Sequence, residues 1–199
     1  MNHELTSKSF GQTIELVKVL IDIIKSEDCT CDCSISTKNA KYLLNQVLRQ
    51  IELSHQKCYI SKNAETLWSS ITEQSILDYW YQSKVVNSLS DNISIKIYKG
   101  ASSKSTEERL LKKGDSFKYR EVFHDDHIIP INVIINQLLK LDQVDDESIM
   151  AIISKISICK MLKEEDREIR ERCNRPFSEN AVIDDIYLPN GILVKAIIR

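Results

Sequence analysis

The spacing of apolar residues changes from helical to strand-like near the middle of the chain. Before residue 88 these residues recur every three or four positions, which places them on one face of a helix. From Ile93 they alternate with polar residues, which places them on one face of a strand. The sequence therefore predicts an α+β fold, with a helical region at residues 1–88 and a second region at residues 89–199.

The helical region contains three apolar stripes. We predict a first helix that ends before residue 28, a second capped by Ser36 or Thr37, and a third capped by Asn63. No stripe carries a catalytic group, so we expect this region to serve assembly, either as a homo-oligomer or with a protein partner. The stripes consist of Ile14, Val17, Leu20, Ile21 and Ile24 in the first helix, Ala40, Leu43, Leu44, Val47, Leu48 and Ile51 in the second, and Leu67, Trp68, Ile71, Leu77 and Trp80 in the third.

For the second region, the spacing of apolar residues predicts short strands separated by loops and helices. Proline suits the first turn of a helix, and acidic residues are favoured there by the helix dipole. A basic loop is expected over residues 99–120. The predicted elements are strands at 93–98, 116–123 and 156–162, helices beginning near Pro130, Glu147 and Lys163, and a closing hairpin at 187–194.

Charge and hydropathy limit the function classes. The 199 residues carry a formal net charge of −2, which argues mildly against a nucleic-acid binder. Between Ile95 and Arg120, however, eight basic residues stand against three acidic ones. No apolar run is long enough to span a membrane, and the N-terminus is polar. We therefore expect a soluble, cytoplasmic protein with no membrane partner.

The six cysteines predict thiols rather than disulfides, because no export signal is present. Cys29, Cys31 and Cys33 could bind zinc with Cys58 or His55 as the fourth ligand. Zinc sites usually have two residues between paired cysteines, which this segment lacks. We interpret it as a loop with ordinary thiols, and a zinc site remains the alternative.

The residues that suggest chemistry are His124, Asp125, Asp126 and His127, which follow a strand-like run and precede Pro130. A carboxylate beside a histidine can hold a divalent cation and supply a base that activates water. Purely structural roles stay open as well. Adjacent aspartates before a proline can simply cap a helix, and the acidic residues at 164–166 can be a solvated helix start favoured by the dipole.

The segment Asp126-His127-Ile128-Ile129-Pro130 resembles the D-H-I-[IV]-P signature of the HNH, or ββα-metal, nucleases. The resemblance covers about residues 114–175 and implies a ββα-metal module with an inserted helical segment between its strands. It implies that His127 is the general base and Asp126 a metal ligand. The remaining ligand would come from the helix after Leu162, as Asp166 or, second, Glu165. His124 is a further, second-choice candidate for this site.

The function that this resemblance implies is a metal-dependent endonuclease, with DNA a better expectation than RNA and a role in restriction or anti-phage defence. It implies Mg²⁺ or Mn²⁺ as the metal and no organic cofactor. The alternative is a non-catalytic interaction protein whose degenerate HNH-like module binds nucleic acid or a protein partner. Candidate phosphate contacts are Lys160, Lys163, Arg167, Arg170, Lys112 and Lys113.

Overall fold

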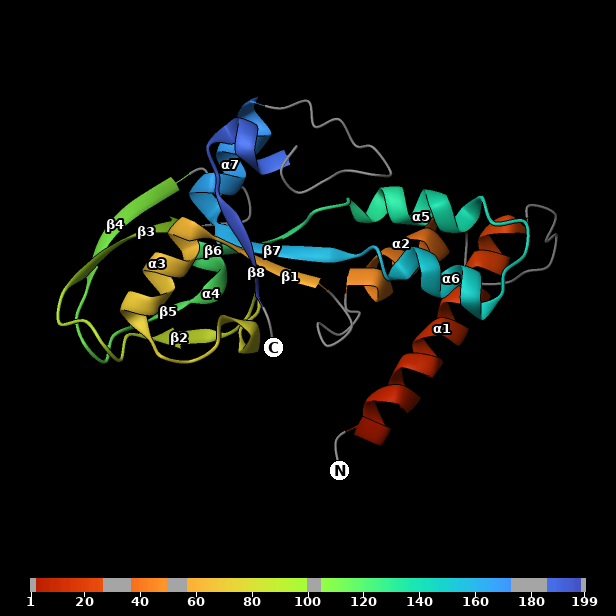
Figure 1. Cartoon of the computed structure of the whole chain (residues 1–199), viewed down its shortest axis with the longest axis horizontal. Helices are drawn as coiled ribbons and strands as arrows, with labels where there is room; N and C mark the ends of the chain where they lie inside the picture. Colours follow the sequence, from red (N-terminus) through yellow and green to blue (C-terminus); the bar gives the residue numbers. More distant parts are fainter. Residues whose placement is uncertain (1–2, 27–36, 50–56, 100–104, 173–185, 198–199) are drawn as a thin grey trace. The chain divides into compact units, whose positions relative to one another are not determined.

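The computed structural model describes residues 3–26, 37–49, 57–99, 105–172 and 186–197 (Figure 1). Helices and strands both contribute substantially, which confirms the predicted α+β class. Among the described helices, none combines the length and the apolar character that crossing a membrane requires. The alternative zinc site lies outside the described residues, which do not include Cys29, Cys31, Cys33 and His55.

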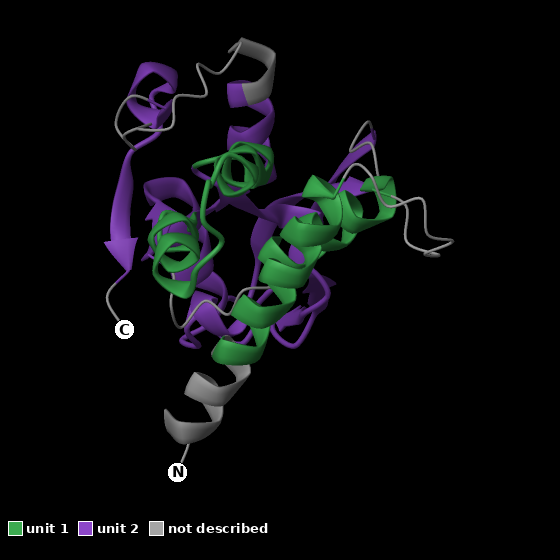
Figure 2. Cartoon of the chain, turned by 90° about the vertical axis from the view of Figure 1, so that its right-hand side faces the viewer, with its two compact units in different colours: residues 1–56, 129–157 green, residues 57–128, 158–199 purple. Residues whose placement is uncertain are grey.

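The chain forms two compact units, each assembled from two separate segments (Figure 2). Unit 1 consists of residues 1–56 and 129–157, and unit 2 of residues 57–128 and 158–199. The boundary that we predicted at residue 88 coincides with none of the three junctions between these segments. The inserted segment joins the N-terminal helices in one unit because its apolar stripes contribute to the same core.

Unit 1 is helical. Its helices are α1 (His3–Lys25), α2 (Thr37–Arg49), α5 (Ile131–Leu139) and α6 (Asp146–Ile153). Helix α5 begins directly after Pro130, and Asp145 caps α6 by accepting a hydrogen bond from the Ser148 backbone N–H at 2.8 Å. The apolar stripes of these helices share one core, in which Val17, Leu44 and Ile134 are fully buried. Most residues of the two predicted stripes are therefore core residues, but Leu43 is exposed and Ile51 lies outside the described residues.

Unit 2 contains the strands, apart from Ser157 at the start of β7, and the four residues His124 to His127. Its main sheet has the strand order β6-β7-β1-β8, and two-stranded ribbons pair β2 with β5 and β3 with β4. The elements are β1 (Lys57–Ser61), α3 (Lys62–Ile71), the 3-10 helix η2 (Ile76–Asp78), β2 (Lys84–Val86), β3 (Ile93–Lys99), β4 (Ser105–Leu111), β5 (Ser116–Lys118), α4 (Tyr119–Val122), β6 (Phe123–His127), β7 (Ser157–Leu162), α7 (Lys163–Arg172), the 3-10 helix η3 (Leu188–Asn190) and β8 (Val194–Ile197).

Four predicted elements differ in the structure. The segment predicted as a basic loop over residues 99–120 contains β4, which pairs with β3. The third helix ends at Ile71 rather than continuing to Trp80, and its cap is Ser61 rather than Asn63. The run at 116–123 is interrupted by α4, because Glu121 accepts a hydrogen bond from the Lys118 backbone N–H and closes a short helical turn. The closing hairpin is wrong: residues 188–190 form a 3-10 turn, and β8 pairs with β1 instead.

Strands β6 and β7 are antiparallel neighbours, with Asp126 opposite Cys159 and His127 opposite Ile158. Helix α7 starts at the residue after β7 ends and packs against β6. The strand-strand-helix order therefore brings the start of α7 close to the motif, although α5 and α6 lie between the strands in sequence.

Candidate metal centre

The alternation of side chains along β6 divides the motif between two environments. Successive residues of a strand point to opposite faces, so His124 and Asp126 share one face while Asp125 and His127 share the other. The partners agree with this division. The Asp126 carboxylate contacts Tyr187, whereas the Asp125 carboxylate contacts Tyr119 and Lys160.

Three potential metal ligands meet on the first of these faces. Donor atoms of His124, Asp126 and Asp166 all lie within 4.8 Å of one another. The two aspartates are buried, with 5% and 7% of their surface exposed, while the His124 side chain is 30% exposed. Ligands that share one cation at bond lengths of about 2.0–2.6 Å must lie within about 5 Å of one another, and these atoms do.

The composition of this group suits a divalent cation. The pair of carboxylates provides the oxygen ligands that Mg²⁺ and Mn²⁺ prefer, and imidazole is a ligand that suits zinc, iron, nickel and copper. The thiol of Cys159 lies opposite Asp126 in the sheet. Its burial, reinforced by the negative charge of Asp126, raises its pKa well above the ordinary value. Cys159 is not among the converging donors of the described residues, so the group offers oxygen and nitrogen ligands, which favour hard or borderline cations over soft ones.

Asp166 is held in place by its neighbour Glu165, at the start of α7. Oε2 of Glu165 accepts hydrogen bonds from the Leu162 backbone N–H at 2.9 Å and from the Ser61 hydroxyl at 2.6 Å. Oε1 accepts a third from the Asn63 amide at 3.0 Å. The bond to Leu162 is one half of a capping box, which fixes the first turn of the helix. Glu165 thus anchors α7 to the junction of β1 and α3, and among the described residues it lies outside the ligand group.

His127, which we predicted as the general base, also lies outside the ligand group of the described residues. It is the last residue of β6, and alternation directs its ring to the face opposite Asp126. Its Nε2 atom is buried in the protein. The structure therefore separates the side chains of the adjacent residues Asp126 and His127.

The predicted phosphate contacts have different positions. Lys163 and Arg167 lie on α7, the helix that carries Asp166, and Arg167 is exposed. Lys112 and Lys113 are exposed near the turn between β4 and β5. Lys160 is fully buried, so the expectation that it contacts phosphates is wrong.

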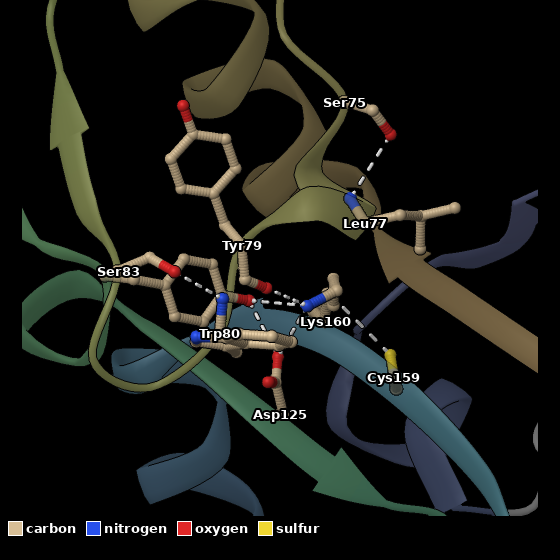
Figure 3. Close-up of polar contacts among 9 residues, drawn as sticks. Ser75, Leu77, Tyr79, Trp80, Ser83, Asp125, Cys159 and Lys160 are labelled. Carbon is tan, nitrogen blue, oxygen red and sulfur yellow. Dashed lines mark hydrogen bonds and ion pairs between the residues drawn. The ribbon is translucent and has the colours of Figure 1, made fainter. Parts of the chain in front are cut away.

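Lys160 instead forms a buried polar network on the second face of the sheet (Figure 3). Its Nζ donates to Asp125 Oδ1 at 3.1 Å and to the backbone carbonyl of Tyr79 at 2.8 Å. The Tyr119 hydroxyl donates to the same Oδ1 atom at 2.7 Å. Burial, together with the charge of Asp125, raises the pKa of Tyr119 well above its usual range, so this hydroxyl remains a donor. Asp125 therefore bonds to Lys160 and Tyr119, which lie apart from the ligand group.

From the sequence, His124 was underestimated and Tyr187 was not identified as part of the candidate centre. His124 was only a second-choice candidate, although the two-residue spacing to Asp126 on a predicted strand already places both on one face. Tyr187 donates to Asp126 Oδ2 at 2.7 Å from a position 61 residues further along the chain. No sequence pattern signalled that contact.

The fold and the group of donors thus define an α+β protein with a histidine and two aspartates arranged as a divalent cation would require. In comparisons with known proteins, no family model, no curated protein and no solved structure matches the chain.

Proposed function

We propose that the protein is a metal-dependent nuclease that hydrolyses phosphodiester bonds, with DNA as the better expectation than RNA and restriction or anti-phage defence as its setting. The observation that carries the proposal is the convergence of His124, Asp126 and Asp166 on a strand-strand-helix arrangement. The same arrangement contains the Asp126-His127-Ile128-Ile129-Pro130 segment that resembles the HNH signature.

His124, Asp126 and Asp166 would hold Mg²⁺ or Mn²⁺. When bound, such an ion supplies positive charge that stabilises the charge developing on the phosphate and on the leaving oxygen. The buried aspartates of β6 and α7 provide the negative charge that attracts the cation. The more exposed ring of His124 lies on the side of the group that solvent can reach. Lys163 and Arg167 on α7 are the nearest of the predicted phosphate contacts along the chain to Asp166.

The base that takes a proton from water has two candidates. His127 is the candidate that the resemblance implies, and a neutral imidazole can act as a base near pH 7. Its buried Nε2 requires that Nδ1, or a movement of the ring, reach the reacting water. The His124 side chain is 30% exposed, but its place among the metal ligands would commit one of its nitrogens to the ion.

The matched substitutions His124→Ala and His127→Ala test these roles. Cleavage of plasmid DNA and of RNA should be measured for each variant with Mg²⁺ and with Mn²⁺, alongside Mn²⁺ affinity without substrate. We expect His124→Ala to weaken Mn²⁺ binding by more than about 10-fold, because it removes a ligand. We expect His127→Ala to bind Mn²⁺ like the wild type. Its cleavage rate should fall by at least about 100-fold, because a general base is lost.

If His127→Ala cleaves at the wild-type rate, His127 is not the general base. The proposed metal centre would be unaffected by that result. A wild-type protein that binds Mn²⁺ and cleaves neither nucleic acid with any divalent metal would contradict the nuclease. That result would favour the second candidate, a non-catalytic module that binds nucleic acid or protein. The observation that favours this candidate is the burial of His127 Nε2.

A further inference from the structure

We infer that Tyr187 is a positioning residue that orients the Asp126 carboxylate for metal binding. The inference rests on the proposed metal centre and extends it to the C-terminal segment. The Tyr187 hydroxyl donates to Asp126 Oδ2 at 2.7 Å, and the two residues are 0% and 5% exposed. Because both groups are buried, water competes little for this hydrogen bond.

Hydrogen bonds and packing hold the segment that follows Tyr187. Gly191, with φ at +72°, closes the 3-10 turn, and the backbone N–H of Ile192 donates to the Tyr187 carbonyl at 3.1 Å. The ring of Tyr187 packs in a small core that also contains Cys159, Met161 and Ile169. The chain then continues into β8, which is fixed to β1 by antiparallel pairing. Tyr187 therefore presents its hydroxyl to Asp126 from a fixed position.

A hydrogen bond of this kind affects how a carboxylate binds a metal. A free aspartate can rotate about its side-chain bonds and present either oxygen, or both, to a cation. The bond from Tyr187 fixes one oxygen, Oδ2, and with it the plane of the carboxylate. Groups that hydrogen-bond to metal ligands in this way orient the ligands, and their loss typically lowers metal affinity about 10- to 100-fold.

The chain offers a matched control on the adjacent residue of the same strand. The Tyr119 hydroxyl donates to Asp125 Oδ1, also at 2.7 Å, and Tyr119 is also buried. Asp125 lies on the face opposite the ligand group. Removing either hydroxyl deletes one short bond from a buried tyrosine to an aspartate of β6, but only one of these aspartates belongs to the proposed centre. The Tyr119 hydroxyl also accepts a longer bond from Lys160 Nζ, at 3.5 Å, so its removal costs stability on the opposite face of the sheet.

The test compares Tyr187→Phe with Tyr119→Phe in the full-length protein. Mn²⁺ binding would be measured by electron paramagnetic resonance in the absence of nucleic acid, at a temperature where circular dichroism shows both variants folded. We expect Tyr187→Phe to bind Mn²⁺ about 10- to 100-fold more weakly than the wild type. Tyr119→Phe should bind like the wild type, although both substitutions lower stability.

Equal Mn²⁺ affinity in Tyr187→Phe and wild type would overturn the inference and leave the proposed metal centre standing, as would equal weakening in both variants. A wild type that binds no Mn²⁺ would contradict both the proposed centre and the inference.

A second measurement uses the wild type alone. In the protein labelled with ¹³C at the tyrosine ζ carbons, Mg²⁺ should shift the signal of a buried tyrosine, and the absence of any shift would contradict the role of Tyr187.

Discussion

Asp166→Asn is expected to abolish Mn²⁺ binding at concentrations that saturate the wild type, and to abolish cleavage with it. The substitution keeps the size of the side chain but removes the negative charge of a ligand that is 7% exposed and lies within 4.8 Å of the other two. Because even a neighbour of a ligand contributes about 10- to 100-fold to affinity, loss of the ligand itself should cost at least about 100-fold.

The stability of the same variant gives an independent readout. A ligand at about 100 times its dissociation constant stabilises a protein by about 2.7 kcal/mol. Mn²⁺ should therefore raise the melting temperature of the wild type but not that of Asp166→Asn. Without metal, the variant should be at least as stable as the wild type, because Asp126 and Asp166 repel each other when no cation lies between them.

Glu168→Gln is the control for this experiment. It removes a carboxylate from an exposed position on the same helix and should leave the melting temperature with Mn²⁺ and the cleavage rate unchanged. If Asp166→Asn retains wild-type affinity for Mn²⁺, the proposed centre is wrong.

Asp125→Ala is expected to destabilise the protein by about 3–5 kcal/mol, the cost of leaving a buried charge without its partner. Lys160 is fully buried, and Asp125 is the carboxylate that neutralises its ammonium, at 3.1 Å. After the substitution, Lys160 Nζ would retain the Tyr79 carbonyl and the Tyr119 hydroxyl, which carry no net charge. Since domains are stable by only about 5–15 kcal/mol, the loss should be obvious in urea unfolding.

The surface pair Lys99–Glu107 provides the comparison. Its side chains are 60% and 48% exposed, so water and salt screen the interaction, and Glu107→Ala should leave the urea midpoint almost unchanged. Asp125→Asn should fall between the two, because it keeps an acceptor for Tyr119 but removes the charge. An Asp125→Ala variant as stable as Glu107→Ala would show that Lys160 does not depend on this pair.

The elements that sequence predicted well are those whose signals are local. The apolar stripe after Pro130 predicted α5, and the alternation at 93–98 predicted β3. The expectation that Asp126 lies near Asp166 came from the resemblance to the HNH signature, and the antiparallel pair β6–β7 followed directly by α7 brings the two residues together. The two elements themselves needed only periodicity and chain order.

The predictions that differ from the structure depended on contacts between distant residues or on a single local bond. The four-residue helix α4 interrupts an alternating run because Glu121 caps it, and one capping bond outweighs strand propensity there. Glu165 looked like a spare ligand until its partners Ser61 and Asn63, more than 100 residues earlier, were known. Lys160 similarly was predicted to contact phosphates from a strand next to a charged helix, and only the structure reveals its burial.

The interleaving of the two units limits what can be learned by shortening the chain. Removal of residues 1–56 would leave every segment of unit 2 present, but it would also leave α5 and α6 without α1 and α2. Ile134 and Leu138, now fully buried, would then be exposed to water and would promote aggregation. An inactive N-terminal deletion would therefore report the loss of this shared core and could not be taken as proof that the first helices bind substrate.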